Sequence, residues 1–325
     1  MKRKIRKTLF ILLILVIVGI ASLLTYVKTA LPNVGEMPQL TIERTPDRIA
    51  RGAYLAQHVM VCVDCHSQRD WSLFAGPPVA GTYGMGGEVF DQKLGFPGRF
   101  VAPNITPAAI GNYTDGELMR AITCGVAKDG RALFPVMPYG NFGKVSEEDI
   151  KSIIAYIRTL QPVENKTEPS EADFPMNFII NTLPHAPSFR PMPDPSDLKA
   201  YGAYLVTAAS CYDCHTRQEK GEFVGKPYAG GMEFQFPDGS ITRSANITPH
   251  PTGIGAWTEQ AFINRFKAYT DTGYHPQKIE PGAFQTVMPW TMYGGMTDYD
   301  LKAIYAYLQT LAPVENEVVH FSPSK

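Results

Sequence analysis

The amino-acid sequence repeats a series of short segments once, and both copies have the same order. In each copy the Met of a Val-Met-Pro segment stands 23 residues before the Leu of a Leu-x-Pro-Val segment. Self-similarity of this kind predicts two homologous domains in tandem. The repeated segments are Gly-Ala-Tyr-Leu at 52–55 and 202–205, Asn-Ile-Thr-Pro at 104–107 and 246–249, Val-Met-Pro at 136–138 and 287–289, and Leu-x-Pro-Val at 160–163 and 311–314.

Each copy also contains the motif Cys-x-x-Cys-His, and these two motifs hold four of the five cysteines. Two thiols three positions apart can add to the two vinyl groups of one porphyrin, and the adjacent His can then bind the iron. A zinc or redox Cys-x-x-Cys is the competing interpretation, but two copies at matching places in a repeat favour haem. The motifs therefore predict two covalently bound haem c groups. The predicted attachment residues are Cys62, Cys65 and His66 in the first copy and Cys211, Cys214 and His215 in the second.

Met137 and Met288 are the candidates for the sixth iron ligand, since haem iron of this kind takes His with Met or His with His. They stand 71 and 73 residues after the His of their motifs, and each is followed by a proline that favours an extended conformation. Core packing is the usual role of a Met, but the equivalent positions in the repeat favour ligation. His250 and His275 are the alternative ligands of the second haem if the sulfur of Met288 does not bind.

The remaining pattern is mainly helical. Ser146 and Thr297 are the expected N-caps of a closing helix in each copy, with acidic residues in the first turn, where negative charge suits the helix dipole. Apolar residues then recur at i, i+3, i+4 and i+7, a stripe that requires burial. A shorter helix is expected over about residues 115–124 and 258–269.

We therefore expect a mainly α fold of two tandem domains after a transmembrane helix. Short hairpins are expected in 76–90 and 221–236, and the middle of the linker, Phe174–Leu183, is apolar enough to pack along a domain. The expected segments are a cytoplasmic basic tip and transmembrane anchor at 1–28, the first domain at 40–165, a Pro-rich linker at 166–195 and the second domain at 196–325.

The N-terminus predicts export. Five basic residues among the first seven precede an apolar run from about Leu9 to Leu24. The run is longer than the roughly 7–15 apolar residues of a cleaved signal peptide, so an uncleaved anchor is favoured over a signal. Either way the basic residues stay in the cytoplasm and the rest of the chain is expected outside. The expected location is the bacterial inner membrane, as a single-pass protein with its haem domains in the periplasm.

Charge excludes one class of partner. The formal net charge is −1, and basic residues do not cluster beyond the first seven, so no nucleic-acid partner is expected. Cys124 has no counterpart in the second copy and is expected to be a buried, inert thiol, with an intermolecular disulfide as the alternative.

Together these segments resemble class I cytochrome c domains, and most closely the cytochrome c subunits of membrane-bound quinoprotein and flavoprotein dehydrogenases. The resemblance covers about residues 46–165 and 196–316. It implies a helical fold around each haem, in which the first and last helices cross where Gly52 and Gly202 permit close approach. Those subunits usually carry three haem domains and often a C-terminal anchor, from which this sequence departs. The ligand pairs that the resemblance implies are His66 with Met137 and His215 with Met288.

The sequence favours an electron carrier over an enzyme, because iron with both axial positions filled does not easily bind substrate. The expected partners are redox proteins: a respiratory dehydrogenase or quinol-oxidising complex as donor, and a soluble cytochrome or terminal oxidase as acceptor. The alternative is a dihaem enzyme, either a peroxidase or a thiosulfate dehydrogenase. Both need an open or labile iron position, which intact Met loops disfavour.

Overall fold

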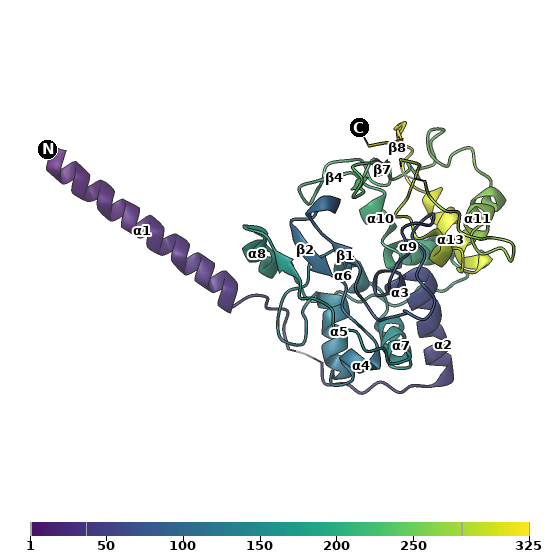
Figure 1. Cartoon of the computed structure of the whole chain (residues 1–325), viewed down its shortest axis with the longest axis horizontal. Coiled ribbons are helices and arrows are strands. Elements are labelled where there is room, and N and C mark those ends of the chain that lie inside the picture. Colours follow the sequence, from purple (N-terminus) through teal and green to yellow (C-terminus); the bar gives the residue numbers. More distant parts are fainter. Residues whose placement is uncertain (1, 37, 281, 325) are drawn as a thin grey trace.

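The structure, a computed structural model, describes all residues except 1, 37, 281 and 325, so these positions of the predicted segments lie outside the description. A helix, α1 (Lys2–Thr29), stands apart from the main body of the molecule (Figure 1). Its length and apolar composition are sufficient to cross a membrane, which agrees with the predicted apolar run. An extended segment then leads to the main body.

The first half of the body, residues 40–165, is built around α2 and α7, which pack against each other. Thr45 caps α2 by accepting a hydrogen bond from the N–H of Arg48, and Pro46 begins the helix. The elements of this half are α2 (Pro46–Tyr54), a π-helical turn η1 (Leu55–Val59), α3 (Cys62–Cys65), β1 (Val89–Phe90), a 3₁₀ turn η2 (Gln92–Leu94), β2 (Gly98–Val101), α4 (Pro107–Ile110), α5 (Asp115–Cys124), α6 (Tyr139–Phe142) and α7 (Glu147–Ile157).

The second half, residues 196–325, repeats this plan with α9 against α13. Thr297 caps α13 as predicted, by accepting a hydrogen bond from the N–H of Asp300. The elements of this half are α9 (Leu198–Ala208), α10 (Cys211–Cys214), β4 (Gln218–Glu219), β5 (Glu222–Phe223), β6 (Glu233–Gln235), β7 (Ile241–Arg243), α11 (Glu259–Lys267), α12 (Trp290–Tyr293), α13 (Asp298–Leu308) and β8 (Phe321–Ser322).

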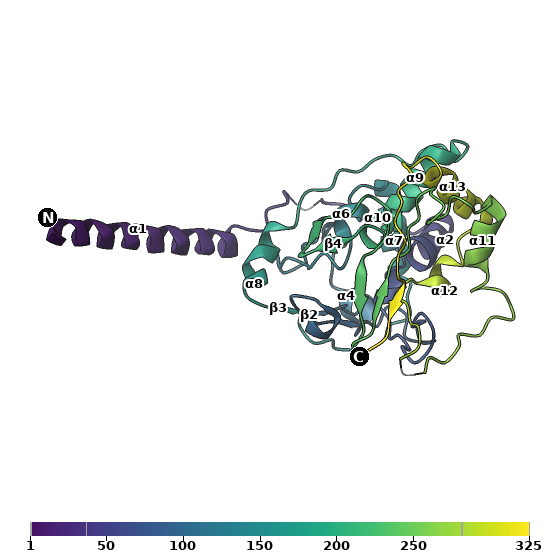
Figure 2. The ribbon, with the colours of Figure 1, turned by 90° about the horizontal axis from the view of Figure 1, so that it is seen from above.

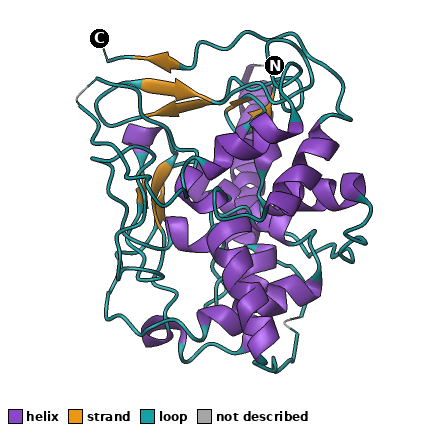
Figure 3. Ribbon diagram, turned by 90° about the vertical axis from the view of Figure 1, so that its right-hand side faces the viewer, coloured by secondary structure: helices purple, strands orange, loops and turns teal. Residues whose placement is uncertain are grey.

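Helices gather in the centre of the body and the short strands lie along its side (Figure 3), which agrees with the mainly α expectation. The hairpins fall only partly where they were expected. In the first half, β1 lies at the end of the predicted stretch and pairs antiparallel with β2 beyond it, with Val89 opposite Val101. In the second half, β5 and β6 belong to different sheets, and the antiparallel pairs are β4 with β5 and β6 with β7. Hairpins depend on pairing partners, which local composition does not specify.

Two further expectations need correction. Ser146 occupies the N-cap position of α7, but its side chain makes no capping hydrogen bond. The apolar middle of the linker was expected to pack along a domain. The residues before it form β3 (Glu171–Ala172), which extends the sheet order to β1-β2-β3. The apolar middle itself forms α8 (Met176–Ile179) and a 3₁₀ turn, η3 (Ile180–Thr182), and both contact α1.

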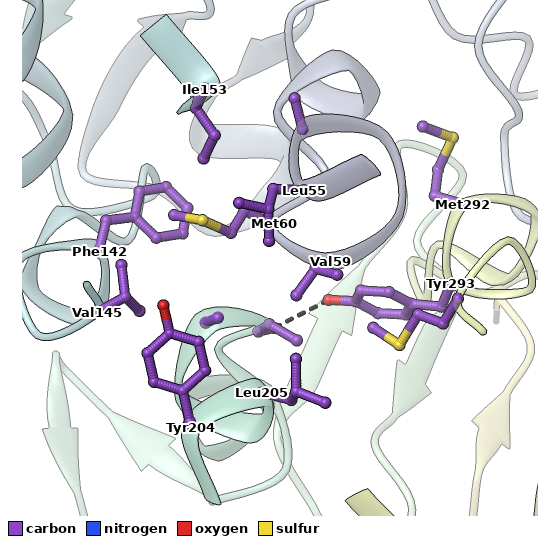
Figure 4. Packing of buried hydrophobic residues seen from close by; sticks show 14 of the residues in the cluster. Leu55, Val59, Met60, Phe142, Val145, Ile153, Tyr204, Leu205, Met292 and Tyr293 are labelled. Carbon is purple, nitrogen blue, oxygen red and sulfur yellow. Dashed lines mark hydrogen bonds between the residues drawn. The ribbon is translucent and has the colours of Figure 1, made fainter. Parts of the chain in front are cut away.

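The two halves share one continuous hydrophobic core. Leu55, Val59 and Met60 of the first half lie close to Tyr204 and Leu205 of the second (Figure 4). The elements that follow the two Val-Met-Pro segments cross between the halves, since α6 packs on α9 and α12 packs on η1. Because each half buries apolar surface against the other, the shared core stabilises both halves.

Two tyrosines reach across the same interface in a reciprocal arrangement. Tyr204 of α9 donates a hydrogen bond of 2.5 Å to Oδ2 of Asp149 in α7. Tyr54 of α2, the equivalent residue in the first copy, donates to Oδ2 of Asp300 in α13. Each bond joins the first helix of one half to the closing helix of the other, so the halves have a defined mutual orientation.

Candidate functional site

The two Cys-x-x-Cys-His motifs adopt the same local structure. Val61 and Ser210, which precede the motifs, have the positive φ values of 44° and 55°. A single helical turn follows in each case, α3 and α10, and the N–H of the motif His bonds to the carbonyl of the first Cys at 3.0 and 2.9 Å. Three-residue spacing on a helical turn places both thiols on one side of it. The structure therefore presents each thiol pair as the covalent attachment of one haem requires.

Both motif histidines are held by one ring nitrogen. Nδ1 of His66 lies 2.8 Å from the carbonyl oxygen of Pro103, and Nδ1 of His215 lies 2.7 Å from that of Ala245. Because a carbonyl oxygen only accepts, Nδ1 must carry the proton, and Nε2 is left with a lone pair for a metal. Burial also lowers the pKa of both imidazoles, which favours this neutral form.

Pro103 and Ala245 are functional positions that the sequence did not reveal as such. They act through backbone carbonyls, which any residue type supplies, so their identities carry no signal. Each stands directly before an Asn-Ile-Thr-Pro segment, and the repetition of that segment was the available clue. The backbone on the other side of each motif is fixed as well, since the N–H groups of Gly86 and Gly230 donate to the carbonyls of the two histidines.

The Asn-Ile-Thr-Pro segments are fastened to the chain that leaves each closing helix. Nδ2 of Asn104 donates to the carbonyl of Val163 at 2.8 Å, and Nδ2 of Asn246 donates to that of Val314 at 2.8 Å. In both segments the Asn Oδ1 also accepts from the hydroxyl of the following Thr. These side chains thus satisfy loop backbone groups, and they hold in place the carbonyl that orients the motif His.

Met137 and Met288 lie in loops of equal geometry. The N–H of the residue after Pro138 bonds to the carbonyl of Met137 at 2.7 Å, and the corresponding bond after Pro289 is 2.8 Å. The two prolines have φ of −79° and ψ of 53° and 65°, the values of an inverse γ-turn. Both Met side chains are partly buried against the shared core. Their role as iron ligands stays a prediction.

The four motif thiols suit covalent attachment to an apolar porphyrin edge. All four are free of disulfides, and burial raises the pKa of each to about 12. They are therefore neutral thiols; three of the cysteines are half-buried, and Cys214 is exposed. The paired thiols and an imidazole with a free Nε2 fit haem c at each motif. The thiols concerned are those of Cys62, Cys65, Cys211 and Cys214.

The acidic residue inside each motif has a different partner in the two halves. Asp64 is buried and pairs with the equally buried Arg69 at 3.2 Å. Burial nevertheless raises the pKa of Asp64 to about 6, with the Arg69 charge acting in the opposite direction. Asp213 instead accepts a hydrogen bond of 2.7 Å from Nδ2 of Asn141, which follows the Val-Met-Pro segment of the other half. The second motif is thus in direct contact with the first half.

Cys124 has the inert setting that was expected. It lies at the end of α5, is 5% exposed, and burial raises the pKa of its thiol. An intermolecular disulfide through a side chain this buried would need the helix to move.

This mainly helical structure, with haem-attachment turns built into it, has the features of a c-type cytochrome. Residues 199–312 match the family described as cytochrome c. The chain is 30% identical over 298 residues to the cytochrome c subunit of a quinone-dependent alcohol dehydrogenase from Gluconacetobacter polyoxogenes, which covers 84% of this chain and 58% of that subunit. It is 30% identical over 282 residues to the fructose dehydrogenase cytochrome subunit of Gluconobacter japonicus, with 81% and 52% covered.

A shorter relative matches along most of its length. The chain is 28% identical over 265 residues to a diheme cytochrome c-type protein of Cereibacter sphaeroides, which covers 78% of this chain and 83% of that protein. The chain spans little more than half the length of the two dehydrogenase subunits. The predicted resemblance to cytochrome c subunits of dehydrogenases is confirmed. The family implies covalently bound haem c, and the similarity supports electron transfer.

Proposed function

We propose that this protein is a membrane-anchored dihaem cytochrome c that carries electrons on the periplasmic side of the inner membrane. The observation that carries the proposal is the duplicated site: two motif turns of the same geometry, each with Nδ1 of its His bonded to a backbone carbonyl. Each half, 40–165 and 196–325, is then one cytochrome c domain, with 166–195 as the connection between them.

At each haem the residues of this chain would have distinct roles. The two Cys thiols would tether the group, and the motif His would offer Nε2 to the iron. Met137 and Met288 would each offer a sulfur to the iron of their half, and a Met ligand raises the reduction potential relative to a second His. When bound, haem c supplies one-electron exchange at iron.

The anchor is α1, retained as a transmembrane helix. The five basic residues of its first turns remain in the cytoplasm, which places the body in the periplasm. Several relatives are named as subunits of alcohol, fructose and gluconate dehydrogenases. By that analogy the electron donor is a dehydrogenase or a quinol-oxidising complex, and the acceptor is a downstream cytochrome or oxidase. An electron carrier needs no open iron position, which is consistent with the two equal Met loops.

The haem count and ligation are tested on purified full-length protein. A pyridine haemochrome assay and intact mass should give two haems per chain. Replacing Cys62 and Cys65 by Ala should remove one haem, and replacing Cys211 and Cys214 should remove the other. One haem per intact chain would contradict the proposal.

Ligation by Met is tested in the oxidised spectrum, where a sulfur-to-iron absorption band appears at the red end. Met137→Ala and Met288→Ala should each abolish about half of this band, whereas Met85→Ala, at a position without a repeat equivalent, should leave it intact. Addition of peroxide or thiosulfate should leave the Soret band of the parent unchanged. A rapid change at one haem would favour the dihaem enzyme instead.

A further inference from the structure

An uncharged apolar segment of the linker, Phe174–Leu183, is conspicuously exposed. Among described residues outside α1, Phe174 is the most exposed large apolar side chain, at 80%. Ile179 in the same segment is 42% exposed. No Asp, Glu, Lys or Arg occurs from residue 174 to residue 189. Apolar side chains gathered in this way on a surface mark a place of contact with something other than water.

The segment lies at the end of α1. Both α8 and η3 contact α1, and Figures 1 and 2 show α8 beside the C-terminal end of that helix from two directions. Lys28, in the last turn of α1, donates a hydrogen bond of 2.6 Å to the carbonyl of Asn177. The same ammonium group lies 4.9 Å from the ring centroid of Phe178. The segment is therefore held to the helix end by specific contacts.

The length of α1 places this junction at a particular depth. With 28 residues the helix is about 42 Å long, at about 1.5 Å per residue. The hydrocarbon core of a bilayer is about 30 Å thick and takes about 20 residues. With the basic residues up to Lys7 in the cytoplasmic headgroups, the next 20 residues reach Val27. Lys28 and the attached α8 then fall at the outer boundary between acyl chains and headgroups.

We propose that residues 174–183 form a second membrane contact, lying in the outer interface of the bilayer beside the anchor. The inference rests on the proposed retention of α1 as the anchor. Apolar side chains such as Phe174 are stabilised at this boundary, and the Lys28 ammonium group, which holds α8 to the helix end, lies at headgroup depth. A single helix followed by an extended segment leaves the body free to tilt. A second contact restrains the orientation of the haem-bearing body relative to the membrane surface.

The test uses the full-length, haem-loaded protein in nanodiscs of phosphatidylethanolamine and phosphatidylglycerol, with no other protein present. Cys124→Ser is introduced throughout, so that a single new thiol reacts. Phe174→Cys and Ile179→Cys report on the segment. Val319→Cys is the matched control, because Val319 is 69% exposed and precedes β8 near the C-terminus. Leu15→Cys reports on the interior of α1. The measurement is the ratio of labelling rates with a charged and with an uncharged, membrane-permeant maleimide.

At positions 174 and 179 we expect this ratio to be about tenfold lower than at 319, because lipid excludes the charged reagent. A ratio at 174 and 179 equal to that at 319, with position 15 still protected, overturns the second contact and leaves the anchor standing. If the charged maleimide labels position 15 readily, α1 is not a membrane anchor, and the proposed second contact fails with it. Protection of 174 that appears only when a dehydrogenase subunit is added assigns the segment to a protein partner and also overturns the proposal.

Discussion

At the scale of single residues, the reciprocal tyrosines are the most consequential feature. The hydroxyl of Tyr204 accepts a hydrogen bond from the N–H of Ser146 at 3.1 Å while it donates to Asp149. A tyrosine of the second half thus satisfies the backbone N–H of the N-cap residue of α7. The hydroxyl of Tyr54 makes the equivalent contact at the start of α13, where it accepts a hydrogen bond from the N–H of Thr297 at 3.1 Å.

Removal of one hydroxyl should therefore weaken the whole interface. Tyr204→Phe removes the hydroxyl that donates a hydrogen bond to the buried carboxylate of Asp149 and accepts one from the N–H of Ser146. We expect the free energy of unfolding to fall by about 1–3 kcal/mol, as measured by urea titration of the haem-loaded protein. Tyr299→Phe is the control. Tyr299 is 45% exposed and donates to the carbonyl of Pro195, so its loss should cost less than about 1 kcal/mol. Equal losses in both variants would contradict the role given to Tyr204.

His58 should make stability depend on pH. Its ring lies in η1 with Nδ1 2.9 Å from the carbonyl of Met292, Tyr54 beside it, and Lys267 of α11 as the nearby positive charge. Burial lowers the pKa of His58 below 6.5; the hydrogen bond to the Met292 carbonyl acts in the opposite direction, and the charge of Lys267 adds a smaller lowering. Below about pH 6.5 the unfolded chain therefore binds more protons at this position than the folded chain, and stability falls as the pH falls.

The urea midpoint should accordingly decrease from pH 7 to pH 5, and His58→Gln should flatten this decrease. His320→Gln, which changes an exposed histidine near the C-terminus, should retain the parent slope. An unchanged slope in His58→Gln would show that the pH dependence arises elsewhere.

At the scale of elements, two glycines decide how closely the helices cross. A Cβ on Gly52 would lie 1.8 Å from the carbonyl oxygen of Ser152, and one on Gly202 would lie 1.9 Å from that of Ala303. The implied crossing of first and last helices at these glycines is confirmed in both halves. Neither glycine has a positive φ, so the requirement is for space rather than backbone freedom.

Gly52→Ala and Gly202→Ala should each force a helix pair apart, because the obstructing atoms belong to the backbone. The expected loss of stability is about 3 kcal/mol or more, with reduced yield of haem-loaded protein. Gly273→Ala, where a Cβ meets nothing within 4 Å, is the matched control and should change the urea midpoint little. A midpoint of Gly202→Ala equal to that of the control would contradict the packing argument.

At the scale of the whole molecule, the halves are held by more than their connection. The core crosses between them, and a loop of the first half pairs with a loop of the second. The N–H of Phe74 donates to the carbonyl of Gln277 at 2.8 Å, and that of Ile279 donates to the carbonyl of Ser72 at 2.8 Å. The N–H of Ala75 adds a bond of 2.8 Å to Oε1 of Gln285.

A cut in the linker should therefore not separate the halves. A protease site inserted between the exposed residues Glu168 and Pro169 should yield two fragments that co-elute on gel filtration in native buffer, each retaining its haem. Addition of urea to unfold the core should then release them. Separate elution in native buffer would contradict the shared core.

The local structure of the two motifs could be predicted from the sequence because it involves few consecutive residues, whereas the ligation of iron stays a prediction. Attachment of a haem needs two Cys and a His within five consecutive residues, and the helix stripes repeat within one element. The duplicated order of segments carried the inference of two halves. The hydrogen bonds of the motif histidines to the carbonyls of Pro103 and Ala245 could not be predicted, because every residue type supplies a backbone carbonyl.

By itself the sequence determined the repeated Cys-x-x-Cys-His motifs, the resemblance to cytochrome c subunits of dehydrogenases and an apolar helix before the repeats. Only the tertiary structure decided how the halves meet. The partners Tyr54 and Asp300 are separated by 246 residues, and the sequence around one of them does not identify the other as its partner. The placement of α8 against α1 likewise joins Lys28 to Asn177 across 149 residues. Such contacts arise when chain segments pack, because a hydrogen bond between distant residues depends on the positions of whole helices and leaves no periodic trace in the sequence.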